Sequence, residues 1–377
     1  MNTKAPKKIG ITGQSGFVGS HLYNTLGLQP EVFERIEFKK EFFADNAQLD
    51  AFVSQCDVIV HLAAMNRHES EQFIYVTNVG LAKQLVASLE RTNSKAHVLM
   101  SSSTQEERDN LYGKSKREGR EALVNWANEC GGKITGLIIP NVFGSFGVPF
   151  YNSFIATFCH QLTHGEIPTI ANDGEVKLIY VQELVQVILD EINSEKSNPA
   201  LLIEPTAHKK VSEVLELLNE YKTKYFDNGE IPVLSSKFEH NLFNTFRTYI
   251  DHKNFFPVKF TQHTDPRGAF VEVIRLGIGG QCSFSTTVPG ITRGNHYHTR
   301  KIERFAVIKG KALIQLRKID TDEVLDFYLD GNEPAYVDMP IWYTHNIKNI
   351  GDEELYTIFW IDEPFNPEDA DTYFLEV

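Results

Sequence analysis

The chain has 377 residues, of which 42% are hydrophobic and 23% charged, a composition that predicts a globular protein with two domains. Its formal net charge of −13 argues against a broad nucleic-acid surface and gives no reason to expect attraction to an anionic membrane. The N-terminal residues contain no apolar signal region, and no apolar run is long enough to span a membrane. The charge therefore favours small-molecule partners. Because the 4 cysteines are scattered without a paired spacing, we expect reduced thiols and a cytoplasmic protein.

A short apolar strand at residues 9–12 runs directly into three glycines, Gly13, Gly16 and Gly19, and then into a sequence that favours a helix. This pattern is typical of the first turn of a nucleotide-binding parallel sheet. The first glycine allows a tight turn, the second lets the backbone approach a pyrophosphate, and the third lets the helix pack on the strand. A purely structural turn is the alternative, so the interpretation depends on the rest of the chain.

Strands and helices alternate over the first half of the chain, as a parallel sheet covered by helices on both faces requires. We expect a helix at residues 16–27 and strands at residues 9–12, 36–38, 58–64 and 98–103. Ligands of such a sheet bind at the carboxyl ends of the strands, where this sequence has small or polar residues.

Two lysines follow the expected second strand, at the point where an acidic residue would bind the 2′-hydroxyl of an NAD ribose. Lys39 or Lys40 would suit the 2′-phosphate of NADP, so the sequence favours NADPH over NADH. Solvated surface lysines are an equally good interpretation of the same pair.

Tyr112 and Lys116 stand four residues apart at the start of an expected helix, shortly after a strand that ends in Ser103. This spacing brings the phenol and the ammonium onto one helix face. Lowering a tyrosine pKa from about 10 to near neutrality takes about 4 kcal/mol, which the ammonium and the positive charge of an oxidised nicotinamide can supply. Lys116 would also hold the nicotinamide ribose, and Ser103 would bond the substrate oxygen. A lone Tyr-x-x-x-Lys is commonly a solvated helix surface, but its order after the glycine turn and the serine strand favours catalysis.

At these residues the chain resembles the extended short-chain dehydrogenase/reductases that act on nucleotide sugars, over approximately residues 7–189. The motifs that carry the resemblance are Thr12-Gly13-x-x-Gly16-Phe17-Val18-Gly19, His61-Leu62-Ala63-Ala64, Asn78-Val79, Ser101-Ser102-Ser103, Tyr112-x-x-x-Lys116 and Pro140-Asn141-Val142-Phe143-Gly144. The resemblance implies that Ser103, Tyr112 and Lys116 are catalytic. The residues expected to bind the cofactor are Gly13, Gly16, Phe17, Val18, Gly19, Lys39, Leu62, Ala63, Ala64, Asn78, Tyr112 and Lys116.

Helical patterns at residues 182–193, 212–225 and 234–250 have the apolar spacing of core-facing helices, and we assign them no chemistry. The helical pattern ends at residues 251–257. We therefore expect a reductase domain with its substrate lobe at residues 1–252 and a second domain at residues 253–377.

The last part of the chain changes to short strands separated by turn residues, which predicts an antiparallel barrel or jelly roll. We expect strands at residues 259–263, 269–274, 312–316 and 355–360. The predicted fold class is therefore α/β, a Rossmann-like doubly wound parallel sheet followed by an all-β domain.

His296 and His298 should point to the same side of a strand, because side chains alternate along it. Glu303 and His345 can join them, and three imidazoles with one carboxylate are a suitable ligand set for a divalent metal with open positions for water or substrate. A bare His-x-His is more commonly an exposed polar pair, and the complete spacing argues against that interpretation.

The stretch from Gly290 to Gly310 resembles the first motif of the cupin family at each defining position. The second cupin motif is kept at Pro340, His345 and Asn349, while Trp342 replaces the usual glycine. The cupin resemblance implies that the histidines and the glutamate are metal ligands.

The same domain is similar to the deoxysugar 3,5-epimerases at residues 265–272 and 293–297. In those enzymes the histidine that matches His296 is a metal-free base, whereas the cupin pattern makes it a ligand. An imidazole nitrogen bound to a metal cannot accept a substrate proton, so the two resemblances disagree. His298, where the epimerases usually have glutamine, favours the metal.

A reductase domain followed by an epimerase-like cupin resembles bifunctional enzymes that make sugar precursors of capsular polysaccharide and lipopolysaccharide. The resemblance implies a UDP-linked 4-keto-6-deoxy amino sugar as substrate, a product on the route to UDP-N-acetyl-L-fucosamine, NADPH, zinc in the cupin, and a homodimer. The chemistry itself gives the order of events: the C3 proton is acidic only while C4 is a ketone, so inversion at C3 must precede reduction at C4.

Two alternatives stay open. In the first, the cupin is a structural or sugar-binding module and the chain is only a 4-ketosugar reductase. In the second, the first domain has lost catalysis and is an NADP-binding regulator of polysaccharide synthesis, although the intact Ser103, Tyr112 and Lys116 argue against this.

Overall fold

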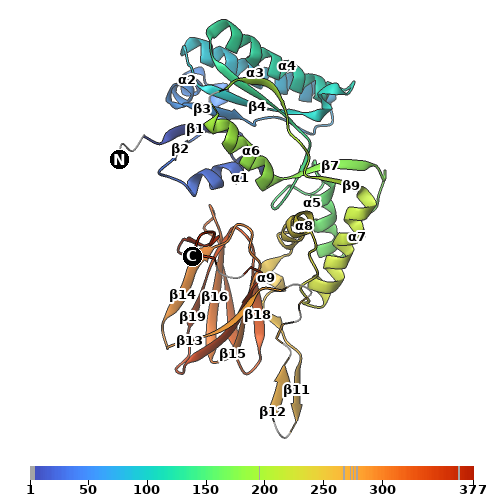
Figure 1. Cartoon of the computed structure of the whole chain (residues 1–377), viewed down its shortest axis with the longest axis vertical. Coiled ribbons are helices and arrows are strands. Elements are labelled where there is room, and N and C mark those ends of the chain that lie inside the picture. Colours follow the sequence, from blue (N-terminus) through green and yellow to red (C-terminus); the bar gives the residue numbers. More distant parts are fainter. Residues whose placement is uncertain are drawn as a thin grey trace. The chain divides into compact units, whose positions relative to one another are not determined.

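The chain divides into two compact units, which are described separately. The first contains Met1–Thr157 and Asn172–Val211, and the second contains Phe158–Ala171 and Ser212–Val377. The computed structural model, drawn in Figure 1, describes residues 5–194, 196–265, 268–271, 273, 274, 276, 279–363 and 366–377. Among these residues, no helix combines the length and the apolar character needed to cross a bilayer.

The first unit is built on a parallel sheet whose strands, within the described residues, follow the order β2-β1-β3-β4-β5-β8. Its strands are β1 (Lys7–Thr12), β2 (Phe33–Ile36), β3 (Val58–His61), β4 (His97–Ser103), β5 (Lys133–Ile139) and β8 (Asn198–Leu202). The strand order reverses between β1 and β3, and such a reversal opens a crevice at the carboxyl ends of the strands. The predicted doubly wound α/β fold is confirmed.

Helices cover both faces of this sheet, as Figure 1 shows for α1 and α6 on one side and α3 and α4 on the other. The helices are α1 (Phe17–Gly27), α2 (Asn46–Gln55), α3 (Glu71–Arg91), α4 (Leu111–Cys130) and α6 (Val181–Asn193). The side chains of β3 explain the two layers, because Val58 and Val60 pack in the core with α1 and α6, whereas Ile59 packs in the core with α2, α3 and α4.

Two expected strands end earlier than the sequence analysis predicts. The second strand ends at Ile36, and Phe38 lies beyond it with its backbone N–H donating to the Gln14 side chain at 3.2 Å. Its ring packs edge-on against the Phe52 ring, so the apolar character of Phe38 reflects a core contact and not a strand. The third strand ends at His61, because the chain then turns into the loop that lines the crevice.

The first unit has further elements besides the parallel sheet and the helices that cover it. A small sheet has the order β6-β7-β9 within the described part of the chain. These elements are β6 (Asn141–Phe143), β7 (Glu175–Tyr180), β9 (Ala207–Lys210), η1 (Lys40–Ala44) and η2 (Thr104–Glu107). The helix α5 (Phe154–Thr163) begins in the first unit and ends in the second.

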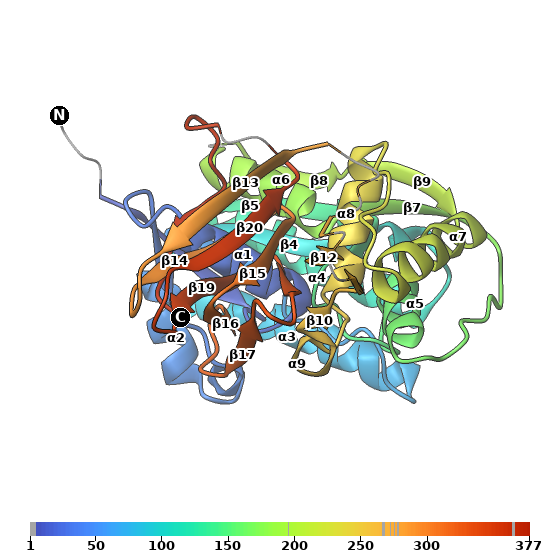
Figure 2. The same cartoon turned by 90° about the horizontal axis from the view of Figure 1, so that it is seen from below.

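The second unit is an antiparallel sandwich of two sheets, which confirms the predicted all-β domain. Over the described residues the first sheet has the order β10-β18-β15-β20-β13 and the second has the order β17-β16-β19-β14-β21. Figure 2 shows β13 and β20 side by side, in agreement with their antiparallel pairing. The strands are β10 (Val258–Lys259), β13 (Gln281–Thr287), β14 (Thr292–Tyr297), β15 (Glu303–Lys309), β16 (Lys311–Lys318), β17 (Val324–Asp330), β18 (Ala335–Met339), β19 (Tyr343–Asn349), β20 (Leu355–Ile361) and β21 (Tyr373–Phe374).

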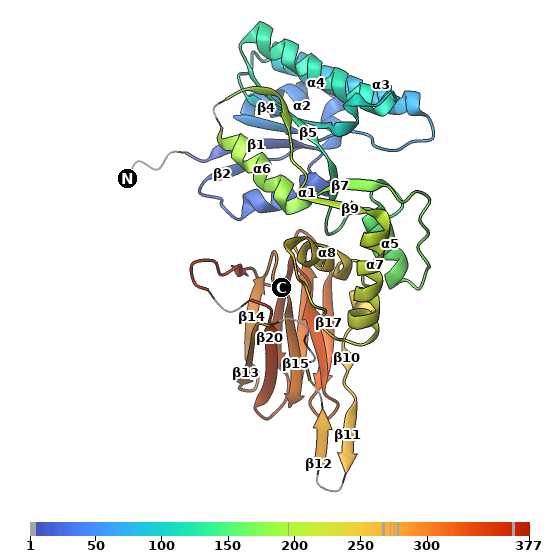
Figure 3. The same ribbon diagram turned by 45° about the vertical axis from the view of Figure 1, so that its right-hand side comes forward.

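The core of the sandwich combines apolar residues of both sheets, among them Val307 and Val337 from one sheet and Ile314 and Ile347 from the other. A separate antiparallel pair, β11 (Gln262–Asp265) and β12 (Gly268–Val271), extends away from the sandwich in Figures 1 and 3. The sequence analysis expects strands at 259–263 and 269–274 in this region; β10 and β11 each overlap one end of the first range, and β12 overlaps the start of the second, in which Glu272 lies outside the described residues.

The second unit also contains helices that the sequence analysis expects in the first domain. They are α7 (Val211–Tyr221), η3 (Lys222–Asp227), α8 (Lys237–Arg247) and α9 (His252–Phe255). The Tyr225 hydroxyl donates to Asp338 Oδ2 at 2.6 Å, and Arg247 donates to the Met339 carbonyl at 2.8 Å, so η3 and α8 are bonded to the sandwich. The compact units therefore differ from the expected boundary after residue 252. An amphipathic pattern predicts that a helix buries one face, but it does not say against which domain.

We expect the substitution Tyr225→Phe to lower the free energy of unfolding of the second unit by about 1.5–3 kcal/mol, because it removes a buried hydrogen bond to a carboxylate. Urea unfolding followed by fluorescence measures this change. Tyr328→Phe is the matched control, since Tyr328 is 66% exposed on β17. Equal stability of the two variants would contradict the docking of η3 on the sandwich.

Candidate active site and metal centre

The turn after β1 is closed by contacts that only glycine allows. Gly13 has a φ of +79°, in the left-handed region. A Cβ atom on residue 19 would lie 2.1 Å from the Gly13 carbonyl oxygen, because α1 starts directly against the turn. The structure therefore gives Gly13 and Gly19 the roles that the motif predicts. The backbone N–H of Gly16 donates to the same carbonyl oxygen at 3.0 Å, immediately before α1.

A cavity of about 640 Å³ lies at the carboxyl ends of β1, β3 and β4, within the first unit. This volume is in the range of small-molecule sites. The start of α1 forms part of its wall, where unpaired helix N–H groups favour an anion. The expected site residues that line it are Gly13, Gly16, Phe17, Val18, Gly19, Leu62, Ala63, Ala64, Ser103, Tyr112 and Lys116.

Tyr112 and Lys116 lie on the first turns of α4, which begins after Asn110 caps the helix by accepting the Gly113 N–H at 2.7 Å. The Tyr112 hydroxyl donates to Asn66 Oδ1 at 3.1 Å. Lys116 is buried, and its Nζ donates to the Ser101 carbonyl at 3.1 Å and lies 5.9 Å from the centroid of the Tyr112 ring. The three expected catalytic side chains thus share one cavity.

The pKa values of this pair are set by burial. Burial raises the pKa of Tyr112 to about 12, with a further contribution from Tyr151, and lowers the pKa of Lys116 to about 8. The sequence analysis expects Lys116 and an oxidised nicotinamide together to lower the pKa of Tyr112; in the chain by itself, burial outweighs the ammonium. The physical reason is that the ammonium is directed at the Ser101 carbonyl and does not offset the removal of the phenol from water.

Two expected cofactor residues lie outside the cavity wall. Lys39 is exposed and pairs with Glu37 at 3.5 Å, whereas Lys40 lines the cavity. Asn78 is buried beneath the loop after β3, where its side chain accepts the Met65 N–H at 2.7 Å and donates to the Met65 carbonyl at 3.0 Å. Asn78 therefore supports the cavity wall from behind.

Glu106 is a buried carboxylate close to Ser103 that no motif in the sequence predicts. Glu106 of η2 accepts two hydrogen bonds from Arg120 of α4, at 2.9 and 2.7 Å, and another from Ser102. This cluster joins η2 to α4 beside the catalytic pair. No spacing rule predicts it, because its members come from three different elements.

The four predicted metal ligands converge between the two sheets of the second unit. His296 lies on β14, His298 directly follows that strand, His345 lies on the neighbouring β19, and Glu303 begins β15 in the opposite sheet. One ligand atom from each residue lies within 4.8 Å of the others, and three of the four residues are buried. The structure thus brings the four residues together, although His298 lies just beyond the end of β14 and strand alternation by itself does not explain its position.

The Glu303 carboxylate is the centre of the cluster. Its Oε2 lies 3.1 Å from His298 Nε2 and 3.2 Å from His345 Nε2. Burial alone would raise the pKa of Glu303, but the interactions with the two imidazoles outweigh burial and lower it. For His298, burial is again opposed by Glu303, and the pKa of His298 is raised. Burial and the neighbouring His345 lower the pKa of His296 to about 4.

The donor set fits a divalent metal. His345 Nε2 is buried and has no hydrogen bond, although it lies 3.2 Å from the carboxylate oxygen. An unbonded buried imidazole nitrogen beside an ionised carboxylate is costly unless a cation satisfies both. Three imidazoles and one carboxylate are ligands that zinc accepts readily.

The departure from the cupin pattern at Trp342 has a clear structural consequence. Trp342 has a φ of +63°, a conformation that favours glycine, and its N–H donates to the His298 carbonyl at 2.8 Å. Its ring stacks on the Tyr297 ring with centroids 5.8 Å apart. The side-chain contacts of the epimerase-like stretch at 265–272 are not described, since Pro266, Arg267 and Glu272 lie outside the described residues.

Two family models match the chain. Residues 9–200 match the NAD dependent epimerase/dehydratase family, and residues 263–373 match the polysaccharide biosynthesis C-terminal domain. The chain belongs to the NAD dependent epimerase/dehydratase family. Membership of this family implies a nicotinamide cofactor and confirms the predicted resemblance to the dehydrogenase/reductases.

Known proteins are similar to the whole chain or to a part of it. The chain is 33% identical over 369 residues to UDP-2-acetamido-2,6-beta-L-arabino-hexul-4-ose reductase of Pseudomonas aeruginosa, covering 97% of this chain and 98% of that protein. It is 36% identical to the crystal structure of capsular polysaccharide assembling protein CapF from Staphylococcus aureus, with a TM-score of 0.61 and coverage of 98% of this chain and 100% of that one. The spore coat polysaccharide biosynthesis protein SpsL of Bacillus subtilis is 27% identical over 123 residues, 30% of this chain and 82% of that protein. The chain is thus CapF-like and homologous to a UDP-ketosugar reductase.

We expect purified protein to bind one divalent metal per chain at the His296 cluster and to lose it to a strong chelator. Glu303→Gln keeps the shape of the side chain but removes the central charge, so the affinity for Zn²⁺ should fall by at least about 100-fold. Metal analysis after dialysis at fixed free Zn²⁺ measures this. Glu333→Gln is the control, because that carboxylate is exposed and paired with Lys259. Equal metal content in both variants would contradict the assignment.

Proposed function

We propose that the chain is a bifunctional nucleotide-sugar enzyme that makes a precursor of capsular or O-antigen polysaccharide. The second domain epimerises a UDP-2-acetamido-2,6-dideoxy-hexos-4-ulose at C3. The first domain then reduces the C4 ketone with NADPH to UDP-2-acetamido-2,6-dideoxy-L-talose, on the route to UDP-N-acetyl-L-fucosamine. The observation that carries the proposal is the cavity in which Ser103, Tyr112 and Lys116 meet the glycine turn. The name of the Pseudomonas aeruginosa relative supports the choice of substrate.

The order of the two steps follows from the acidity of the substrate. A proton on C3 is acidic only while C4 is a ketone, because the carbonyl stabilises the negative charge left on C3. Inversion must therefore come first. Reduction then removes the carbonyl, so the inverted centre no longer exchanges and the freely reversible first step becomes directional.

The first site needs an acid for the reduction. Bound NADPH supplies the hydride. Tyr112 gives its proton to the C4 oxygen, and a pKa of about 12 keeps its phenol in the protonated form that this role requires. The ammonium of Lys116, on the same helix face, stabilises the phenolate that the transfer leaves behind. Ser103 bonds the substrate oxygen at the end of β4, and Asn66 orients the phenol before substrate binds.

The second site needs charge stabilisation at oxygen while C3 is inverted. His296, His298, Glu303 and His345 would hold a divalent cation, for which zinc is our choice, and the cation supplies that stabilisation when bound. This makes His296 a ligand and not the base. The homodimer implied by the resemblance and the cytoplasmic location expected from the cysteine pattern stay predictions.

We expect Tyr112→Phe to slow NADPH oxidation by about 10²–10⁴-fold, because the acid is lost while the cavity keeps its shape. Solvent deuterium should still enter at C3 at the wild-type rate, since that exchange depends on the other domain. Absorbance of NADPH and NMR of the UDP-sugar in deuterated water measure the two reactions. Tyr75→Phe is the control, because its phenol bonds Glu118 on α4 and does not line the cavity.

The same assay distinguishes the alternatives. Loss of both reactions in a folded Tyr112→Phe variant would argue against independent sites. Wild-type protein that oxidises NADPH without any exchange at C3 is only a reductase with a structural or sugar-binding second domain. Wild-type protein that binds NADP(H) but oxidises none of it with 4-keto sugars is a regulator.

We expect Lys40→Ala to raise the KM for NADPH on the order of tenfold and to leave the KM for NADH unchanged, because the lost charge would face only the 2′-phosphate. Steady-state kinetics with each cofactor measures the difference. Lys39→Ala is the matched control, as its ammonium pairs with Glu37 outside the cavity wall. Equal effects of the two substitutions would reject Lys40 as the residue that selects NADPH.

A further inference from the structure

The C-terminal segment, residues 366–377, returns to the strand that carries the metal cluster. In β21, Tyr373 pairs with Tyr297 and Phe374 pairs with His296 of β14. The Leu375 N–H also donates to the Asn295 carbonyl at 2.9 Å. The last residues of the chain are therefore bonded along the edge of β14, which carries His296 and directly precedes His298.

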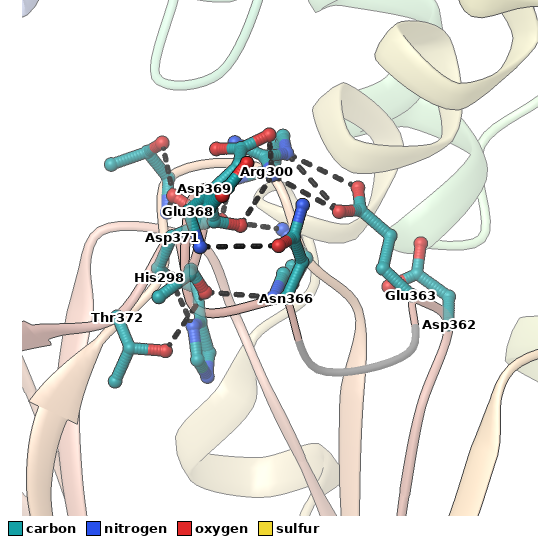
Figure 4. Close-up of polar contacts among 12 residues, drawn as sticks. His298, Arg300, Asp362, Glu363, Asn366, Glu368, Asp369, Asp371 and Thr372 are labelled. Atoms are coloured by element: carbon teal, nitrogen blue, oxygen red, sulfur yellow. Dashed lines mark hydrogen bonds and ion pairs between the residues drawn. The ribbon is translucent and has the colours of Figure 1, made fainter.

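Asp371 connects this segment to the loop that follows β14. Its carboxylate accepts three successive backbone N–H groups, from Thr299 at 3.0 Å, Arg300 at 3.0 Å and Lys301 at 3.1 Å, and the Thr299 hydroxyl at 2.6 Å. Figure 4 shows Asp371 beside His298 within this network. Asp371 is 4% exposed, and its φ of +43° turns the backbone so that the carbonyl as well as the carboxylate faces the loop.

The carbonyl of Asp371 defines which nitrogen of His298 faces the cluster. His298 Nδ1 lies 2.5 Å from the Asp371 carbonyl oxygen, and its Nε2 lies 3.1 Å from Glu303 Oε2. A carbonyl oxygen only accepts hydrogen bonds, so Nδ1 carries a proton. The lone pair that can bind a cation is then on Nε2, which points at the carboxylate.

Contacts on both sides hold Asp371 in place. Arg300 bonds Asp369 Oδ2 at 2.8 Å and Glu363 at 3.1 Å, as Figure 4 shows, and the buried Lys301 donates to the Ala370 carbonyl at 2.7 Å. The loop thus donates to the C-terminal segment at three consecutive residues.

We infer that Asp371 is a positioning residue for the metal centre: its carboxylate fixes the loop after β14, and its carbonyl holds His298 with Nε2 directed into the cluster. The inference rests on the metal centre of the proposed function. Bonds to the second nitrogen of a histidine ligand orient the ring and fix its tautomer, and their loss typically weakens metal affinity by about 10–100-fold.

Asp371→Asn tests this role with little change in volume. Both carboxylate oxygens accept backbone N–H groups, so either orientation of the amide places an NH₂ group against a donor. We expect the affinity for Zn²⁺ to fall about 10–100-fold and the visible absorption bands of the Co²⁺-loaded protein to shift. Asp369→Asn is the matched control. Asp369 lies in the same C-terminal segment as Asp371, but its exposed carboxylate bonds Arg300 and not His298. Thermal unfolding of the metal-free variants checks their folds.

A second measurement uses the wild-type chain and does not depend on any variant. Long-range ¹H–¹⁵N NMR of the Zn²⁺-loaded protein should show the His298 ring with its proton on Nδ1 and its metal bond through Nε2. A metal bond through Nδ1 would overturn the inference, as would a folded Asp371→Asn variant with the Zn²⁺ affinity and Co²⁺ spectrum of Asp369→Asn. Wild-type protein that takes up no metal would overturn the metal centre itself, and this inference with it.

Discussion

The close approach of α1 to the turn after β1 is the constraint on which the first site depends. The Gly13 carbonyl oxygen occupies the space that a side chain at residue 19 would need, so the helix starts at the end of the strand and its N-terminus faces the cavity. The Leu62 N–H donates to the Thr12 carbonyl, which brings the loop after β3 to the same turn. Tyr112 reaches this loop by bonding Asn66, and Asn78 holds the loop from behind. The cavity is therefore assembled around one backbone contact.

The two sites use burial in opposite ways. In the first site desolvation is the largest influence on both groups and outweighs the attraction between Lys116 and Glu106, so burial raises the pKa of Tyr112 and lowers that of Lys116. In the second site the buried Glu303 lies within 3.2 Å of two imidazole nitrogens, and these interactions outweigh burial. The first environment thus preserves a neutral acid, whereas the second preserves an ionised carboxylate at the centre of a ligand set.

The sequence predicts those features that depend on local spacing. The glycine turn and the Tyr112 and Lys116 pair are each fixed by the geometry of one turn or helix, and only one residue separates His296 from His298. Local spacing does not show which of the two candidate lysines lines the cavity, where the structure has Lys40, or that the helices of residues 212–252 group with the second unit. Asp371 gave no signal because it is far from His298 in the sequence and acts through its backbone.

The neutral phenol of the first site and the ionised carboxylate of the second give a physical reason for two separate sites in the proposed function. Reduction at C4 needs a phenol that stays protonated until it donates, and a divalent cation close to it would favour the phenolate and withdraw that proton. Inversion at C3 needs the opposite, a strong positive charge that stabilises a developing oxyanion. One cavity that served both steps would compromise one of them. Ser103, Tyr112 and Lys116 belong to the first unit and the His296 cluster to the second, so each chemistry keeps its own environment.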